Sequence, residues 1–124
     1  MEDSRYCVPH QRDLSQEERA ILVYLLQLEA PERLPQIDAL KIIARCGCGG
    51  CPTVLFGNSF DAAPVTKDHY ILADYTGKNS SGGLIGVMVW ANDSDITELE
   101  GYSVDGSEPV TWPVLLALRP VPDA

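Results

Sequence analysis

The sequence has few basic side chains, and one long stretch has none. Lys and Arg number 9 against 18 Asp and Glu, so the formal net charge is −9, and no Lys or Arg occurs from Asn79 to Leu118. Nucleic acids and anionic membranes both repel a chain of this charge. We therefore expect neither as the main partner, and a basic protein is the natural complement.

The sequence also lacks long apolar runs and a basic leader. No segment reaches the run of about 20 apolar residues that a membrane-spanning helix needs. The first residues, Met1 to Tyr6, are acidic and polar, whereas a signal peptide starts with a basic region followed by an apolar one. These absences predict a cytoplasmic protein of bacterial type. With 124 residues, 45% apolar and 22% charged, residues 1–124 fit one soluble domain.

Familiar catalytic motifs are missing as well. The chain has 2 histidines, His10 and His69, and neither belongs to a metalloprotease motif; there is no nucleophile elbow. The glycine-rich segment Gly77–Gly83 has Lys78 near its start, whereas a phosphate-binding loop ends in lysine. The sequence therefore favours a protein that is not an enzyme, and an enzyme without a recognisable motif stays a third alternative.

The first third of the chain predicts helices. Residues 1–13 show no periodicity and are expected to form an irregular arm. Residues 14–41 form the helical part, in which Ser15 and Glu18 have the spacing of a capping box and Glu17–Glu29 carries an apolar stripe. Prolines then end this helix, and a second short helix is expected from Pro35 to Lys41.

From residue 42 to 118 the pattern changes to strands. Two strands flank a turn that holds three cysteines, a third strand covers His69–Tyr75, and a clear hairpin joins Leu84–Ala91 to Asp95–Val104. Residues 119–124 are expected to be a tail. Helices followed by strands indicate an α+β fold, with an N-terminal helix or helical pair on one face of an antiparallel sheet of about four to five strands.

Three of the 4 cysteines lie close together, in the run Cys46-Gly47-Cys48-Gly49-Gly50-Cys51. A structural zinc ion needs four ligands, and thiolates two to four residues apart are a common way to supply two of them. The fourth ligand is then Cys7 or His10, brought to the turn by the N-terminal arm. The sequence thus allows either no cofactor or a zinc ion.

Other interpretations of the cysteines stay open. The Cys-x-x-Cys form of Cys48 and Cys51 matches a redox pair, but such pairs depend on a helix N-terminus and the residues after Cys51 are typical of a strand. An iron–sulfur cluster lacks its four-cysteine spacing. The simplest interpretation is that the thiols are small apolar groups packed in a tight hairpin, where glycine permits close approach.

Two blocks of the sequence resemble small bacterial proteins of no established function. Those proteins carry an Arg-Cys-Gly-Cys-Gly-Cys block and a later Leu-Glu-Val-Tyr-Ser block, and the matching segments here begin at Arg45 and Leu99. The resemblance covers residues 41–112. This chain differs by the extra Gly50 and by Gly101, where those proteins usually have an aliphatic residue. The resemblance supports the order of elements and implies no activity.

The returning strand of the last hairpin predicts an acidic surface. Alternation directs Leu99 inward and places Glu98, Glu100 and Tyr102 together on the solvent-exposed face. Asp93 lies in the preceding turn, and Asp95 begins the strand. Our leading hypothesis is a small binding protein that presents these five residues to a basic protein, as immunity and inhibitor proteins do. The zinc-stabilised module is the alternative, and the sequence leaves the oligomeric state open.

Overall fold

The computed structural model describes residues 7–122, which form an α+β fold. Over that range the elements, in chain order, are β1 (Cys7–Arg12), α1 (Gln16–Glu29), the 3-10 helix η1 (Pro31–Ala39), β2 (Lys41–Cys46), β3 (Val54–Gly57), β4 (Tyr70–Lys78), β5 (Leu84–Ala91), β6 (Ile96–Ser103), the 3-10 helix η2 (Leu115–Ala117) and β7 (Arg119–Pro120).

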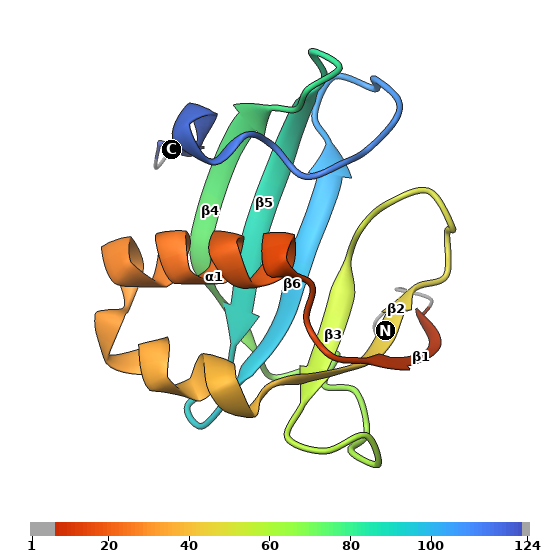
Figure 1. Cartoon of the computed structure of the whole chain (residues 1–124), viewed down its shortest axis with the longest axis vertical. Helices are drawn as coiled ribbons and strands as arrows, with labels where there is room; N and C mark the ends of the chain where they lie inside the picture. Colours follow the sequence, from red (N-terminus) through yellow and green to blue (C-terminus); the bar gives the residue numbers. More distant parts are fainter. Residues whose placement is uncertain (1–6, 123–124) are drawn as a thin grey trace.

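The strands form one antiparallel sheet made of two meanders. Its order is β1-β2-β3-β6-β5-β4-β7, so the first three strands form one meander and β4 to β6 form the other. The meanders join where β3 pairs with β6, with Val54 opposite Leu99 and Leu55 opposite Glu98. The chain between the meanders, residues 58–69, runs as a loop from the end of β3 to β4 (Figure 1).

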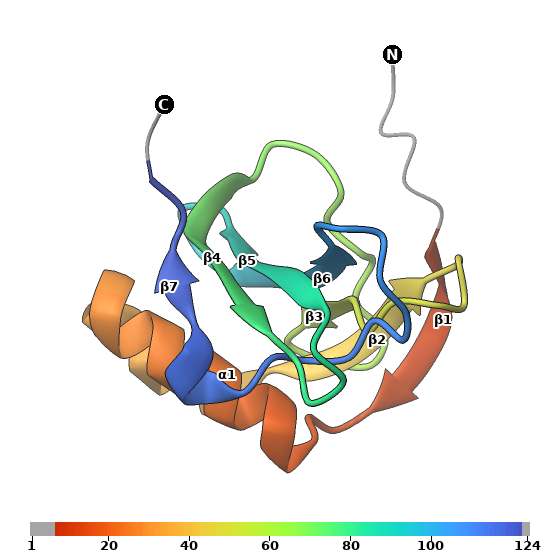
Figure 2. The same ribbon diagram turned by 90° about the horizontal axis from the view of Figure 1, so that it is seen from above.

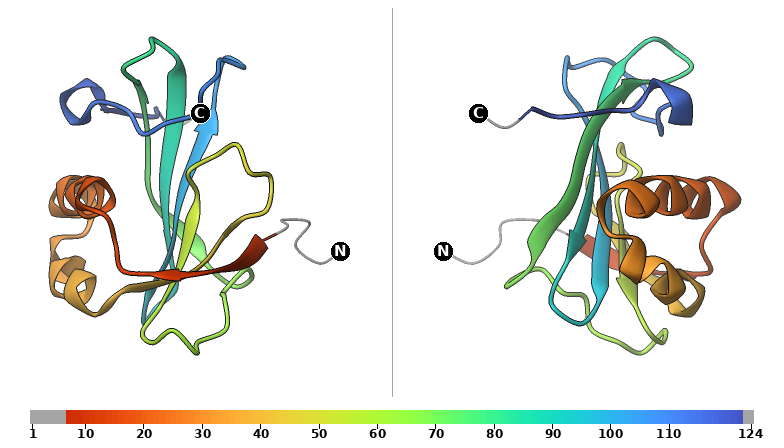
Figure 3. Two further views of the ribbon diagram at one scale, coloured as in Figure 1. Left: turned by 45° about the vertical axis from the view of Figure 1, so that its right-hand side comes forward. Right: turned by 90° about the vertical axis from the view of Figure 1, so that its left-hand side faces the viewer.

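The helices cover one face of this sheet. The sheet is strongly curved and α1 lies across one side of it (Figure 2), with η1 on that same side (Figure 3). The inner stripe of α1 is fully buried and belongs to one core cluster with Leu99 of β6 and Val87 and Val89 of β5. Each such aliphatic side chain contributes about 1.5–3 kcal/mol when it leaves water, so burial of this stripe holds α1 against the sheet. The stripe consists of Ile21, Leu22, Leu25 and Leu26.

The start of α1 follows the predicted capping box. The Ser15 hydroxyl accepts from the Glu18 backbone N–H at 3.1 Å, and the Glu18 carboxylate accepts from the Ser15 N–H at 2.8 Å. The carboxylate also receives two bonds from the Arg12 guanidinium, at 2.9 and 2.8 Å. Burial raises the pKa of Glu18, but the bonds from Arg12 and Ser15 outweigh it and leave this pKa below its usual value.

The sheet has more strands than the expected four to five. The described part of the predicted arm, Cys7–Arg12, forms the edge strand β1, and Arg119–Pro120 of the predicted tail form the opposite edge strand β7. Both contain proline, which is tolerated at a sheet edge because no ladder bond from its nitrogen is needed. Their pairing with β2 and β4 is tertiary, so the local pattern carries little sign of it. Residues 1–6 of the arm and 123–124 of the tail lie outside the described residues.

The second helix also differs from its prediction. It runs from Pro31 to Ala39 as a 3-10 helix rather than from Pro35 to Lys41. Pro31 occupies its first turn, where the missing N–H is harmless, and Pro35 falls inside it. Lys41 already belongs to β2. The prolines therefore start the second helix as well as ending the first.

Candidate metal centre

The three clustered cysteines lie at the tip of the β2–β3 hairpin, as the sequence predicts. Strand β2 ends at Cys46 and β3 begins at Val54, and the Cys46 backbone N–H donates to the Thr53 carbonyl at 3.2 Å. Gly49 in this turn has φ of +75°, a conformation that glycine adopts without strain. The turn thus reverses the chain and brings Cys48 and Cys51 back toward Cys46.

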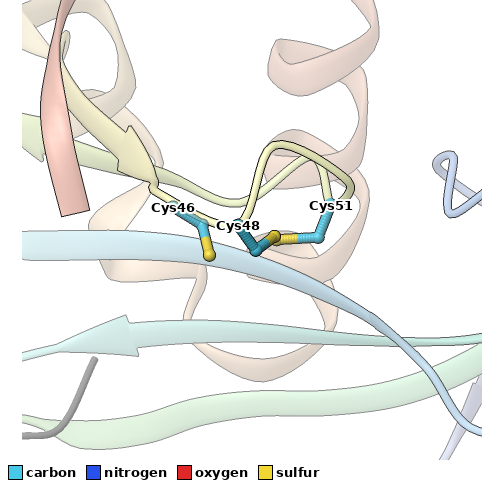
Figure 4. A group of neighbouring side chains, drawn as sticks. All are labelled: Cys46, Cys48 and Cys51. Atoms are coloured by element: carbon cyan, nitrogen blue, oxygen red, sulfur yellow. The ribbon is translucent and has the colours of Figure 1, made fainter. Parts of the chain in front are cut away.

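The three sulfur atoms converge on one point. The Sγ atoms of Cys46, Cys48 and Cys51 all lie within 4.8 Å of one another (Figure 4). Cys48 Sγ and Cys51 Sγ lie 3.2 Å apart. Cys48 is exposed, whereas Cys46 and Cys51 are half-buried, and all three are free thiols. This group can hold a metal ion, because thiolate sulfur is a strong ligand for soft metals.

The surroundings of the thiols favour a negative charge at Cys48. The Gly50 backbone N–H donates to Cys48 Sγ at 3.3 Å, and this bond together with those from Cys51 and Cys46 lowers the pKa of Cys48 to about 7. Burial, together with the neighbouring thiols, raises the pKa of Cys46 to about 11. The backbone amide of the turn therefore stabilises the Cys48 thiolate without a helix N-terminus.

A buried hydroxyl fixes the base of the turn to the neighbouring meander. Thr53 Oγ1 donates to the Gly101 carbonyl at 3.2 Å and accepts from the Gly101 N–H at 3.1 Å. Cys51 Sγ lies 3.5 Å from the same hydroxyl. A Cβ on Gly101 would lie 2.8 Å from the ring of Trp112 and 2.9 Å from Pro52, so the close approach of these segments requires glycine there. Sequence reasoning missed Thr53, because its partner is distant in the chain.

The two expected fourth ligands differ in position. The Cα of Cys7 is the cross-strand partner of the Cα of Cys46 in the β1–β2 ladder, so the two residues are neighbours. His10 lies further along β1, where its Nε2 accepts from Arg12 Nε at 3.1 Å. Among residues 7–122, the group whose ligand atoms converge includes neither of them. The structure brings three of the five predicted ligands together.

The predicted acidic strip on β6 needs correction at Glu98. Leu99 is buried in the core beneath α1, so alternation does place Glu98, Glu100 and Tyr102 on the other face, the helix-free face. However, Glu98 is 0% exposed. It lies between Leu55 of β3 and Trp90 of β5, its register partners. Glu98 is therefore an interior residue and not part of a wet surface.

The other two residues of the strip are half-buried and have an unpredicted acidic neighbour. Glu100 accepts from Trp90 Nε1 at 2.8 Å, and the ring of Tyr102 lies over Gly86, where a Cβ would collide with it. Asp74 of β4 and Glu100 both face Met88 in register, so they lie in one row across the sheet. Burial and then the charge of Glu100 raise the pKa of Asp74. In the sequence, Asp74 lies between Ala73 and Tyr75, which are buried, and this alternation along β4 indicates that Asp74 stands on the opposite face.

The two aspartates of the turn lie apart from this row. Asp93 is exposed and Asp95 is half-buried, and both lie in the connection between β5 and β6. The Oδ1 atom of Asn92 holds this turn, because it accepts from the backbone N–H groups of Ser94 and Asp95 at 2.9 and 2.7 Å. Asp95 Oδ1 also accepts from Asn58 Nδ2 at 3.4 Å. The five predicted partner-binding residues therefore divide into a turn pair, a half-buried pair and one interior glutamate.

Comparisons with known proteins add no assignment. No family model, no curated protein and no solved structure matches this chain. Within residues 7–122, no helix has both the length and the apolar character needed to cross a membrane. We therefore infer function from the side chains of this protein alone.

Proposed function

We propose that this protein binds zinc through the thiolates of Cys46, Cys48 and Cys51, and that the metal stabilises the tip of the β2–β3 hairpin. The observation that carries the proposal is the convergence of three sulfur atoms within 4.8 Å of one another. With Zn–S bonds of about 2.3 Å, two thiolates on one tetrahedral zinc ion lie about 3.8 Å apart. The cluster therefore needs little rearrangement to take a zinc ion.

The ligand type supports zinc over the hard cations. All three converging ligand atoms are sulfur, and Mg²⁺ and Ca²⁺ require oxygen ligands. The low pKa of Cys48 supplies one thiolate near neutral pH, and a bound cation lowers the pKa of its remaining thiol ligands. We expect zinc affinity to rise with pH for the same reason, since protons compete with the metal.

Cys7 is the proposed fourth ligand. Directly opposed residues of an antiparallel pair have Cβ atoms about 4.5–5.5 Å apart and stand on the same face of the sheet, and Cys7 is opposite Cys46. The imidazole of His10 is instead engaged by Arg12. With Cys7 as ligand, zinc joins the edge strand β1 to the hairpin tip, and the site is a closed four-thiolate structural site.

Metal analysis of the full chain tests this proposal. Protein purified without added metal is expected to contain one equivalent of zinc, and less than about a tenth of an equivalent ends the proposal, because a structural site binds tightly. Titration with Co²⁺ gives a second readout, since thiolate-to-cobalt charge-transfer absorption reports sulfur ligation. Cys46→Ser is expected to abolish tight binding.

The fourth ligand is tested with a matched pair of variants. Cys7→Ser is expected to weaken zinc binding and to reduce the thiolate–cobalt absorption. His10→Ala removes the other expected ligand from the same strand, and we expect it to leave both readouts unchanged. The opposite ranking of the two variants would assign the fourth position to His10.

We propose as a second function that the helix-free face binds a basic protein. Asp74 and Glu100 share a row of the sheet beside the aromatic rings of Trp90 and Tyr102, which combines negative charge with large contact groups. The test measures association with a panel of small basic toxin domains. Asp74→Lys with Glu100→Lys is expected to abolish binding, whereas Glu108→Lys, an exposed acid outside this row, changes it little. The idea fails if the double reversal leaves every measured affinity unchanged.

A further inference from the structure

Two of the three clustered thiols are close enough to react with each other. Cys48 Sγ and Cys51 Sγ are 3.2 Å apart. This separation lies between the ~3.8 Å expected for two thiolates on one zinc ion and the ~2.05 Å of a disulfide bond. A small contraction of the turn therefore brings the two sulfur atoms to bonding distance, and an oxidant can then join them.

The turn that joins these two cysteines is free to contract. Gly49 and Gly50 are both exposed, and a Cβ placed on either glycine would meet nothing within 4 Å. Cys46 differs, because it ends a strand and its backbone N–H is held by Thr53. Movement of Cys48 toward Cys51 thus disturbs neither the core nor the β2–β3 ladder.

We propose that Cys48 and Cys51 form a reversible disulfide by exchange with a small disulfide such as oxidised glutathione, and that this bond empties the metal site. The metal half of this inference rests on the proposed zinc function. Disulfide formation removes two of the three converging sulfur ligands, and the remaining thiolates cannot hold zinc tightly. The hairpin tip is then a redox-controlled metal site.

The exchange proceeds in two balanced steps. The exposed Cys48 thiolate attacks one sulfur of the small disulfide, which forms a mixed disulfide at Cys48 and releases one small thiolate. Cys51 then loses its proton and attacks Cys48 Sγ, which forms the Cys48–Cys51 bond and releases the second small thiolate. The protein dithiol loses two electrons, and the small disulfide gains them.

Thiol counting on the full chain tests the disulfide. Alkylation under denaturing conditions is expected to label all 4 cysteines of the reduced protein but only Cys7 and Cys46 after treatment with oxidised glutathione. Peptide mapping identifies the bonded pair. With zinc-loaded protein, a chromophoric chelator is expected to record one zinc ion released for each disulfide formed.

Two variants separate the steps. Cys51→Ser lacks the second nucleophile, so a stable glutathione adduct is expected to accumulate at Cys48. Cys46→Ser is the matched control, because it removes a metal ligand but leaves both reacting sulfurs, and the same Cys48–Cys51 disulfide is expected as its end product. A disulfide between Cys7 and Cys46, or a lasting adduct in the natural chain, overturns the proposed pairing.

The outcomes distinguish this inference from the zinc function. If the protein never binds zinc but the Cys48–Cys51 disulfide forms, the zinc function is wrong and the exchange reaction stands. If the protein binds zinc and keeps both its metal and four alkylatable cysteines in the presence of oxidised glutathione, the zinc function stands and the redox control is wrong.

Discussion

The hairpin tip and strand β6 both carry reactive or charged residues at short spacing. The fold brings those of the tip together, whereas it gives those of β6 different environments. At the tip, Cys46, Cys48 and Cys51 converge to within 4.8 Å although they come from a strand and a turn. On β6, Glu98 and Glu100 occupy the same face of one regular strand, but Glu98 is 0% exposed whereas Glu100 is half-buried.

The hairpin tip and β6 differ because different structural elements lie beside them. The tip is bounded by its own glycine-rich turn, so local spacing decides its geometry. The environment of β6 changes along its length, because β3 pairs with it only at Leu99 and Glu98. Glu98 therefore has a strand on each side, whereas Tyr102 is paired with β5 alone. Alternation predicts which face a residue occupies, and burial depends on neighbouring strands.

Charge reversal along β6 gives the largest expected effect. Glu98→Lys places a longer side chain of opposite charge in the interior between Leu55 and Trp90, and we expect it to lower the free energy of unfolding by about 3–5 kcal/mol. Glu100→Lys loses the bond from Trp90 at a half-buried position and is expected to cost about 1 kcal/mol. Urea denaturation measures both, and equal costs would show that the two positions are equally accessible.

Zinc removal is the corresponding experiment at the hairpin tip. A ligand that binds only the folded state adds about 4 kcal/mol to the free energy of unfolding when its free concentration is a thousand times the dissociation constant. Chelation is therefore expected to lower the melting temperature of the natural chain by about 10–20 °C and to leave that of Cys46→Ser unchanged. A natural chain that is insensitive to chelators would contradict the metal site.

The sequence predicts the features that depend on residues close in the chain, and it misses those that depend on distant residues. The capping box of α1, the β2–β3 hairpin and the three clustered cysteines depend on residues close in the chain, and the structure contains all three. Strands β1 and β7 depend on pairing across the sheet, and the local pattern around Pro9 and Pro120 predicts no strand. Glu98 is buried by residues far from it in sequence, so alternation alone predicts the wrong exposure.

Thr53 connects the two regions, so its substitution is expected to affect both. Thr53→Val removes the hydroxyl that donates to and accepts from the Gly101 backbone, which leaves a buried N–H and carbonyl without these bonds. We expect a loss of about 2 kcal/mol in the free energy of unfolding and weaker zinc binding. Thr53→Ser keeps the hydroxyl and is the control. Full stability of the valine variant would show that the link contributes little.

The smallest expected effect concerns Glu18, which is a second interior carboxylate besides Glu98. The bonds from Arg12 and Ser15 outweigh burial and lower the pKa of Glu18 in the folded state. A lowered pKa stabilises the fold above the unfolded pKa, and this stabilisation is lost as pH falls through the folded pKa. We therefore expect a contribution of about 1 kcal/mol at neutral pH, reduced because Arg12 is partly exposed, and lost on acidification below about pH 5.

Glu18→Gln isolates this contribution. The variant cannot ionise at this position, so its free energy of unfolding is expected to fall less steeply than that of the natural chain between about pH 5 and pH 3. Asp38→Asn is the matched control, because it removes an exposed ion pair with Arg19 and is expected to leave the acid-dependent loss in place. Parallel curves for the natural chain and Glu18→Gln would show that the Arg12–Glu18 pair contributes no pH-dependent stability, although Glu18 is buried as Glu98 is.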